Sequence, residues 1–472
     1  MPKPAETTRP QPPGRDDWLR AIGGAAALDE LRHRTLDGID IEPLSARALG
    51  SCASASRANP AVWDIRALHA GADAAAANAA IADDLNGGAT SIALKLGTPG
   101  DFGLPPRYDA IAAALAGVPL DKIEVSLLCG DQYFGAAQTM LALFEATGRP
   151  GHELRAGIFA DPLGTLARTG ALEAGLWPSL ELLGQFVAAN FEPWPLVRLL
   201  LADGALYHDA GASEAQELAA VLATVLEYVR VLDFDGVSAA ALWPHLTVSL
   251  AADCDQLATI AKLRAARVLL ARLAGGLGAP DAAREVQIWA TTSQRMLTTQ
   301  ALHTNVLRNT IAAFSAAVGG ADAITVYPHD WAAGASSAAS RRLARNTQLL
   351  LAEESGLARV LDAGAGSGSI EAFTEALARR AWALFQEIEA SGGMAKALLA
   401  GGLQDGIFDM AARREKLFSE GKLAVTGVTA FVAADGEAGP VHAHPAPAPI
   451  ERAETRVPAL PVRRLSAQGE TK

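Results

Sequence analysis

Short apolar runs alternate with segments of helical period through most of the chain. The runs begin at Ser91, Ile123, Leu154, Pro195, Leu246, Glu285, Ala323 and Arg359. Each is partly β-branched and often closes at Gly, Asp or Pro, as buried parallel strands do. Between the runs, apolar residues recur every three or four positions, and the segment after Asp255 has both an Asp cap and a terminal Gly. The pattern predicts an α/β fold, as a (β/α)8 TIM barrel or as a doubly wound open sheet.

The two ends of the chain differ from this middle part. Residues 1–60 are expected to form an extended and partly helical arm that wraps a partner, and residues 61–432 the barrel. Residues 433–472 are rich in Pro and Ala and are expected to be a disordered tail. For both ends the alternatives are a disordered linker and an arm that becomes ordered against a partner.

Composition narrows the class of protein. Half of the 472 residues are hydrophobic and 19% are charged, which suits a sizeable core and excludes a largely disordered chain. The formal net charge of −12 argues against a general nucleic-acid binder. We find no apolar stretch of about 18 residues, so no membrane span is expected.

Targeting and cysteine use point to the cytoplasm. Met1–Asp17 is polar and rich in proline, unlike a secretory signal. Cys52, Cys129 and Cys254 are scattered and form no CxxC pair, so neither a disulfide framework nor a cysteine zinc site is expected. The histidines show no metal-binding spacing, and we expect no metal ligands.

Two motifs suggest chemistry. Val360–Ser369, with Asp362 and a run of glycines, is similar to the cofactor loop of an S-adenosylmethionine methyltransferase, but too little chain follows to complete that domain, which favours a tight barrel loop. Tyr207, His208 and Asp209 follow a predicted strand and could form an acid–base set or a surface loop. The segment that begins at Tyr327 could likewise form an acid–base set or a surface loop.

Five segments together resemble the methylmalonyl-CoA mutase family. They are Leu31–Leu44, Gly117–Leu127, Ala261–Leu273, Leu297–Asp330 and Arg342–Leu398. The last contains Arg-Asn-Thr-Gln, Glu-Glu-Ser and Gly-Gly-Met in the family's order and spacing. The resemblance covers about residues 15 to 430 and implies the TIM barrel rather than the open sheet.

The resemblance also implies a reaction and its cofactor. The family interconverts methylmalonyl-CoA and succinyl-CoA with adenosylcobalamin, which supplies a radical, while acyl-CoA threads the barrel axis. A separate flavodoxin-like domain with a D-x-H-x-x-G signature carries the cobalamin. This chain shows no such signature, so the cofactor is expected on a partner and none is expected to bind this chain directly.

Several positions depart from the family's catalytic pattern. Matched on Ala210-Gly211-Ala212, the family's Tyr and His become Ala205 and Leu206, although a two-residue gap would restore Tyr207 and His208. In the run that ends at Ser293, Gln287 and Trp289 replace an Arg and a His. Other departures are Ser45 for a Tyr, the loop Gly97–Pro106 without a Tyr, and Gly368-Ser369 where aromatic residues are typical.

These departures resemble the small (beta) subunit of heterodimeric mutases. That resemblance implies a non-catalytic subunit of an isomerase that supports a large (alpha) catalytic subunit, with acyl-CoA as a further candidate ligand. The first alternative is an active barrel that uses a separately encoded cobalamin-binding subunit, with Tyr207 and His208 as its catalytic candidates. An S-adenosylmethionine methyltransferase and a scaffold or chaperone for a mutase complete the alternatives.

Overall fold

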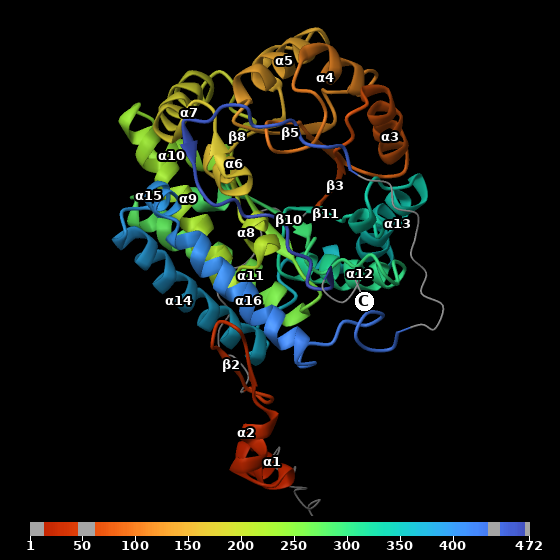
Figure 1. Ribbon diagram of the computed structural model, residues 1–472, viewed down its shortest axis with the longest axis vertical. Helices are drawn as coiled ribbons and strands as arrows, with labels where there is room; N and C mark the ends of the chain where they lie inside the picture. The colour runs from red at the N-terminus through yellow and green to blue at the C-terminus, as the bar shows by residue number, and fades with distance from the viewer. Residues whose placement is uncertain (1–13, 46–61, 433–443, 468–472) are drawn as a thin grey trace, which may run out of the picture.

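Eight parallel strands close into a barrel, and helices surround it as an outer ring (Figure 1). The computed structural model describes residues 14–45, 62–432 and 444–467. The strands are β3 (Asp64–His69), β4 (Ser91–Lys95), β5 (Glu124–Gly130), β6 (Ala156–Ala160), β8 (Val197–Asp203), β9 (Leu246–Ala252), β10 (Gln287–Thr292) and β11 (Ala323–Thr325). They lie in chain order around the barrel, which closes where β11 pairs with β3. The predicted TIM barrel is confirmed.

The outer ring and the C-terminal helices account for most of the remaining chain. The ring contains α3 (Ala74–Asn86), α4 (Tyr108–Ala114), α5 (Tyr133–Glu145), α6 (Pro162–Thr169), α7 (Leu176–Asn190), α8 (Ala205–Ala210), α9 (Glu214–Phe234), α10 (Ala239–Leu242), α11 (Gln256–Gly276), α12 (Thr304–Val318) and α13 (Ala338–Leu349). Three more helices, α14 (Gly368–Ala390), α15 (Met394–Ala400) and α16 (Gly402–Ser419), follow. Helix α14 packs across α9 and α11.

Local signals in the sequence set several helix starts. The Asp255 carboxylate accepts a hydrogen bond from the amide of Ala258 and caps α11, as the pattern predicted. Asp161 caps α6 in the same way through Gly164. Ser213 and Gln216 form a reciprocal capping box at the start of α9. The caps at Asp161 and Asp255 start α6 and α11 shortly after β6 and β9, whereas α9 follows α8.

One predicted barrel strand is wrong, and one strand of the barrel was missed. The segment from Arg359 forms a short 3-10 turn and an irregular loop, because Val360 and Leu361 are about half exposed and have no strand to pair with. The strand that takes its place in the barrel is β3. Its sequence DIRALH carries Asp64, Arg66 and His69, so it lacks the apolar run expected of a buried strand.

The N-terminal residues 14–45 project away from the barrel (Figure 1). They comprise α1 (Arg15–Ile22), α2 (Ala25–Leu31) and a hairpin of β1 (His33–Arg34) and β2 (Asp40–Ile41). Asp37, at the turn of the hairpin, accepts hydrogen bonds from the Ser213 hydroxyl and the Ala215 amide. These hydrogen bonds attach the hairpin, and with it the rest of the arm, to the start of α9. Residues 1–13 and 46–61 of the expected arm, including Cys52, lie outside the described residues.

Residues 444–467 differ from the expected disordered tail. They cross the carboxyl-terminal face of the barrel, where β12 (Thr455–Arg456) pairs with β7 (Ala171–Leu172) (Figure 1). The Leu460 side chain is buried, and its amide donates to the carbonyl of Ala167. Hydrogen bonding and apolar burial hold this segment in place. Residues 433–443 and 468–472 of the expected tail lie outside the described residues.

Among the helices of the described ranges, none combines the length and the apolar run needed to cross a bilayer.

Candidate functional site

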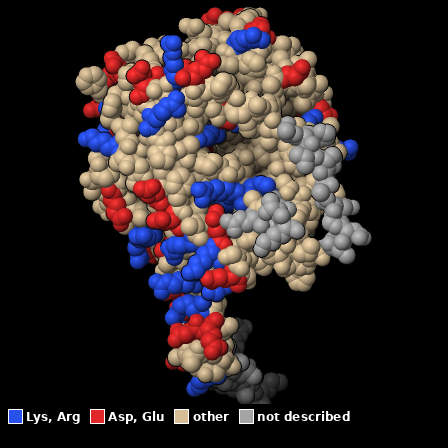
Figure 2. Space-filling view, in the orientation of Figure 1, with Lys and Arg blue, Asp and Glu red and all other residues tan. Residues whose placement is uncertain are grey.

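A cavity of about 160 Å³ lies at the carboxyl ends of the strands, where barrels carry their functional groups. Figure 2 shows this face hollowed over the barrel. Leu460 and Val462 of the C-terminal segment form part of its wall. The other lining residues include Leu68, Lys95, Asp101, Phe102, Leu128, Arg168, Leu201, Asp203, Ala205, Leu206, Asp209, Ser249, Trp289, Thr291, Gln294, Tyr327 and Trp331.

The charged groups of the cavity pair with one another. Lys95 Nζ lies 2.6 Å from Asp101 Oδ1, and Arg168 pairs with Asp203 and lies 3.7 Å from Asp101. Burial lowers the pKa of the Lys95 ammonium. Burial works to raise the pKa of Asp101, but the charges of Lys95 and Arg168 outweigh it and hold that pKa below its ordinary value. Both cations are thus already neutralised, which leaves little attraction for an anionic substrate.

Large side chains fill the barrel below the cavity. Trp289 and Phe159 pack with ring centroids 5.7 Å apart, in a small cluster with Ala93, Leu201 and Ala323. The indole Nε1 of Trp289 donates to Thr325 Oγ1 at 2.9 Å, so the ring is held in one orientation. These rings leave the axis closed at that level.

Buried charge fills the next level of the interior. The Arg66 guanidinium lies 5.4 Å from the centroid of the Trp289 ring. It donates to Glu124 Oε1 at 2.7 Å and to Gln287 Oε1 at 3.3 Å. Gln287, one of the departures from the family's pattern, therefore serves as a partner of Arg66 rather than as a group facing the cavity.

Ala205 and Leu206 face the cavity after β8, and Asp209 lines it as well, whereas the pair Tyr207 and His208 between them does not. All these residues belong to α8, which starts directly after the strand. Successive side chains of a helix point about 100° apart, so the second pair turns away from the axis. Tyr207 and His208 are buried, and burial together with nearby Asp161 raises the pKa of the Tyr207 hydroxyl well above its ordinary value.

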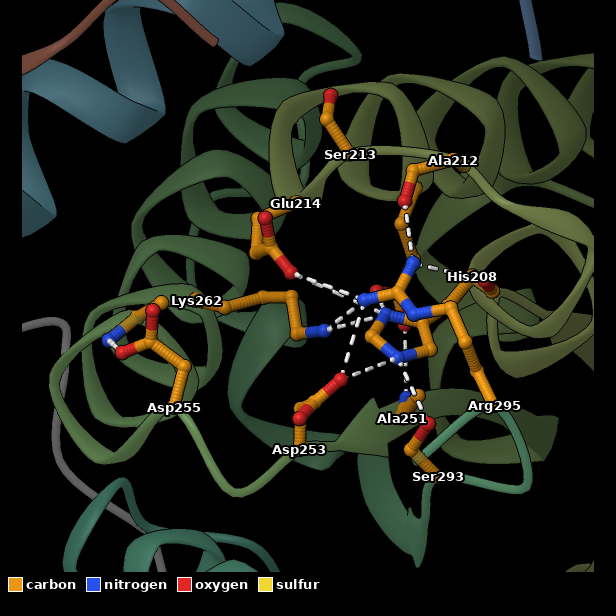
Figure 3. Close-up of polar contacts among 12 residues, drawn as sticks. His208, Ala212, Ser213, Glu214, Ala251, Asp253, Asp255, Lys262, Ser293 and Arg295 are labelled. Atoms are coloured by element: carbon orange, nitrogen blue, oxygen red, sulfur yellow. Dashed lines mark hydrogen bonds and ion pairs between the residues drawn. The ribbon is translucent and has the colours of Figure 1, made fainter. Parts of the chain in front are cut away.

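His208 lies in a buried polar cluster behind the barrel wall (Figure 3). Its Nε2 is 3.2 Å from Asp253 Oδ2 and 3.0 Å from Ser293 Oγ. On the other side of the ring, Nδ1 is 3.4 Å from Glu217 Oε2. The imidazole is fully enclosed, which denies it contact with a molecule in the cavity.

Glu217 and Lys262 complete the cluster. Lys262 Nζ donates to Glu217 Oε2 at 2.5 Å, and the second Glu217 oxygen accepts from the Ala251 amide at 2.7 Å. Arg295 donates to the carbonyls of His208 and Ala212 (Figure 3). Because these residues come from α8, α9, β9, α11 and the loop after β10, the cluster joins the barrel to its outer helices. The sequence analysis did not identify this cluster. Charged residues within the apolar pattern of α11, such as Lys262, were the signal that could have indicated it.

The glycine-rich loop is not built as a cofactor loop. Within the described residues 62–432, a 3-10 turn rather than a strand comes directly before it. The Asp362 carboxylate pairs with Arg264 of α11, which also donates to Glu371 Oε1 at 2.8 Å. Asp362 is therefore committed to an ion pair with α11. The Tyr327 side chain does line the cavity, where it packs on Trp331 with centroids 4.8 Å apart.

The comparison with known proteins identifies a family. The family model described as methylmalonyl-CoA mutase matches residues 106–460. The methylmalonyl-CoA mutase small subunit of Streptomyces virginiae is 40% identical over 440 residues, which cover 90% of this chain and 70% of the relative. The small subunit of Propionibacterium freudenreichii subsp. shermanii is 34% identical over 421 residues, covering 86% of this chain and 64% of the relative.

A large subunit is also similar. The methylmalonyl-CoA mutase large subunit of Streptomyces virginiae is 33% identical over 320 residues, covering 67% of this chain and 43% of the relative. This chain therefore spans less than half of that large subunit and about two thirds of the two small subunits.

Proposed function

Because the chain belongs to the methylmalonyl-CoA mutase family, we propose that it serves as the small (beta) subunit of a heterodimeric mutase. In this role it supports a catalytic large (alpha) subunit and carries out no chemistry of its own. The complex would interconvert methylmalonyl-CoA and succinyl-CoA.

The closed barrel axis carries this proposal. An acyl-CoA chain that threads a barrel needs an open axis, and here Trp289 packed on Phe159 occupies it. The cavity above is about 160 Å³, well below the roughly 300–1,000 Å³ of common ligand pockets. Ala205 and Leu206 offer no proton donor to a thioester oxygen where the family has Tyr and His.

The face above the cavity does not fit adenosylcobalamin. The C-terminal segment crosses it, and the rings of Phe102 and His444 stack there with centroids 4.8 Å apart. His444 Nε2 also lies 3.0 Å from the carbonyl oxygen of Trp331 and so is engaged within the chain. We therefore assign the cofactor to the large subunit and derive no step that passes through it here.

The alternative of an active barrel with a separate cobalamin-binding subunit requires Tyr207 and His208 at the reacting center. Neither lines the cavity, and His208 is held by Asp253, Ser293 and Glu217. The methyltransferase alternative requires a free Asp362, which instead pairs with Arg264. The observations thus favour the supporting subunit over both.

Reconstitution with the large subunit tests the proposal. We expect this chain alone to show no mutase activity, and the large subunit to gain stable activity when the chain is added. Tyr207→Phe removes only the buried hydroxyl, so the variant complex should turn over as the wild type does. Phe408→Tyr, a change of the same single hydroxyl on α16, is the matched control. Loss of turnover in Tyr207→Phe with the complex intact would instead support the active barrel.

A further inference from the structure

An open groove of about 440 Å³ lies where the arm joins the barrel body. The hairpin of the arm forms one wall, and α14, α16 and the start of α9 form the others. Figure 2 shows Lys and Arg side chains gathered over this region, just above the arm. We call it the arginine groove, after Arg34, Arg380 and Arg413, which line it.

These arginines are poorly neutralised. Within the described ranges, neither Arg380 nor Arg413 forms an ion pair, and both are exposed. Arg34 is 71% exposed and comes no closer than 3.8 Å to Asp40. By contrast, the neighbouring Arg379 pairs with Glu375 on its own helix. The groove thus presents guanidinium groups that are available to an anion from outside.

The acid in the groove wall, Asp37, offsets only part of this charge, since three arginines line the groove and Arg380 is among the groups that lower the pKa of its carboxyl. Asp37 already accepts hydrogen bonds from the Ser213 hydroxyl and the Ala215 amide. Burial and the neighbouring Glu214 raise its pKa to about 6. The local excess of positive charge stands out in a chain whose net charge is −12. Such a patch attracts an acidic surface while the rest of the molecule repels it.

Apolar side chains line the same groove and narrow the class of ligand. They include Leu384 on α14 and Met410 and Leu417 on α16. Guanidinium groups bind carboxylates through paired hydrogen bonds, and arginine next to apolar surface is typical of protein interfaces. A free phosphate would leave the apolar wall unused. A peptide segment that carries both acidic and apolar side chains would use both.

We propose that the arginine groove binds an acidic segment of the large subunit, with apolar side chains of that segment against Leu384, Met410 and Leu417. This inference rests on the proposed function, because it names the contact by which the small subunit holds its partner. The arm supplies one wall of the groove, so docking of the partner also secures the arm against the barrel.

Charge reversal in the groove tests the inference. We would measure the dissociation constant between the full chain and the large subunit at low and at physiological salt. The double variant Arg380→Glu and Arg413→Glu should bind at least about tenfold more weakly at low salt and should lose much of the salt dependence. Arg379→Glu, one residue along the same helix, is the matched control and should stay within about twofold of wild type.

Further variants separate the possible outcomes. The milder pair Arg380→Gln and Arg413→Gln should give a smaller loss, which guards against misfolding of the reversed variant. If the reversed variant binds as tightly as Arg379→Glu does, the groove proposal fails and the subunit role stands. If the wild-type chain does not bind the large subunit, both proposals fail. The last measurement is a titration of the chain with pyrophosphate. Tight binding of pyrophosphate, together with a reversed variant whose affinity for the large subunit is unchanged, would assign the groove to small anions instead.

Discussion

The ring of Trp289 lies against that of Phe159 inside the barrel, with centroids 5.7 Å apart. Trp289 comes from β10 and Phe159 from β6, so the pair bridges the interior between strands that are not neighbours. Barrel interiors are commonly packed with side chains, but a barrel threaded by acyl-CoA would need this space open. In this chain the two rings fill that space and form part of a buried hydrophobic cluster.

Trp289→Ala should therefore cost stability without creating activity. Removal of a buried indole loses apolar burial and leaves a cavity, with an expected cost of about 3–5 kcal/mol. Urea unfolding would measure the change. Trp177→Ala on α7, where the side chain is 53% exposed, is the control and should change stability far less. A gain of mutase turnover by Trp289→Ala would contradict the view that the departures from the family's pattern abolish chemistry.

The buried pair of Lys262 and Glu217 is expected to be a major determinant of stability. Lys262→Met removes one charge and leaves the Glu217 carboxylate without its cation, at an expected cost of about 3–5 kcal/mol. Thermal or urea unfolding would show the loss. Lys416→Met removes an equivalent charge from an exposed pair with Glu420, and little change is expected there. Equal effects of the two substitutions would refute the role of the cluster.

A substitution at Gly170 would test whether pairing with β7 holds the C-terminal segment in place. The φ of Gly170 is +75°, and a Cβ added there would lie 2.7 Å from the carbonyl oxygen of Val457. Gly170→Ala should therefore strain the backbone and also displace residues 455–460. Gly117 has nearly the same φ, +76°, but no neighbour within 4 Å of such a Cβ. Gly117→Ala thus reproduces the backbone strain alone.

Hydrogen exchange would separate these two effects. Gly170→Ala should raise exchange at the amides of Val457 and Leu460, which donate to Gly170 and Ala167. The Gly117→Ala variant should leave those amides protected. Unchanged protection in both variants would mean that contacts elsewhere, such as those of Arg463 and Leu465 with the barrel, hold the segment.

The raised pKa of Asp37 predicts that the stability of the hairpin depends on pH. Burial and Glu214 raise its pKa from 3.8 to about 6, whereas Ser213, Ala215 and Arg380 act in the opposite direction. A carboxyl with a raised pKa binds more protons in the folded chain than in the unfolded chain. Asp37 therefore lowers the free energy of unfolding increasingly between pH 3.8 and about 6, and by a constant amount above that pH. Asp37→Asn should remove this component of the pH dependence.

The measurement for Asp37 is a comparison of the two proteins across pH. The melting temperature of Asp37→Asn relative to wild type should rise between pH 4 and 6 and level off above that. Asp40→Asn, which removes a carboxylate from the exposed strand of the same hairpin, is the matched control variant. A constant difference between Asp37→Asn and wild type over this range would show that Asp37 does not titrate there.

Much of the barrel could be read from the sequence, because seven of its strands are mostly buried on both faces and consist largely of apolar residues, which gives the expected runs. The strand β3 could not, since Arg66 and Asp64 interrupt its pattern. The burial of Arg66 makes sense only beside Glu124 and Gln287, which are distant in the chain. Conversely, Val360 and Leu361 have the right composition for a strand but lack a neighbour with which to pair.

The sequence by itself determined the class of fold and the family resemblance, because burial on both faces of a parallel strand and helix caps leave local patterns. It left open whether Ala205 and Leu206 or Tyr207 and His208 face the cavity. Tertiary structure decided this, since α8 starts directly after β8 and turns the second pair toward α9 and α11. A shift of two helical positions reverses the direction of a side chain, and the local sequence does not specify that shift.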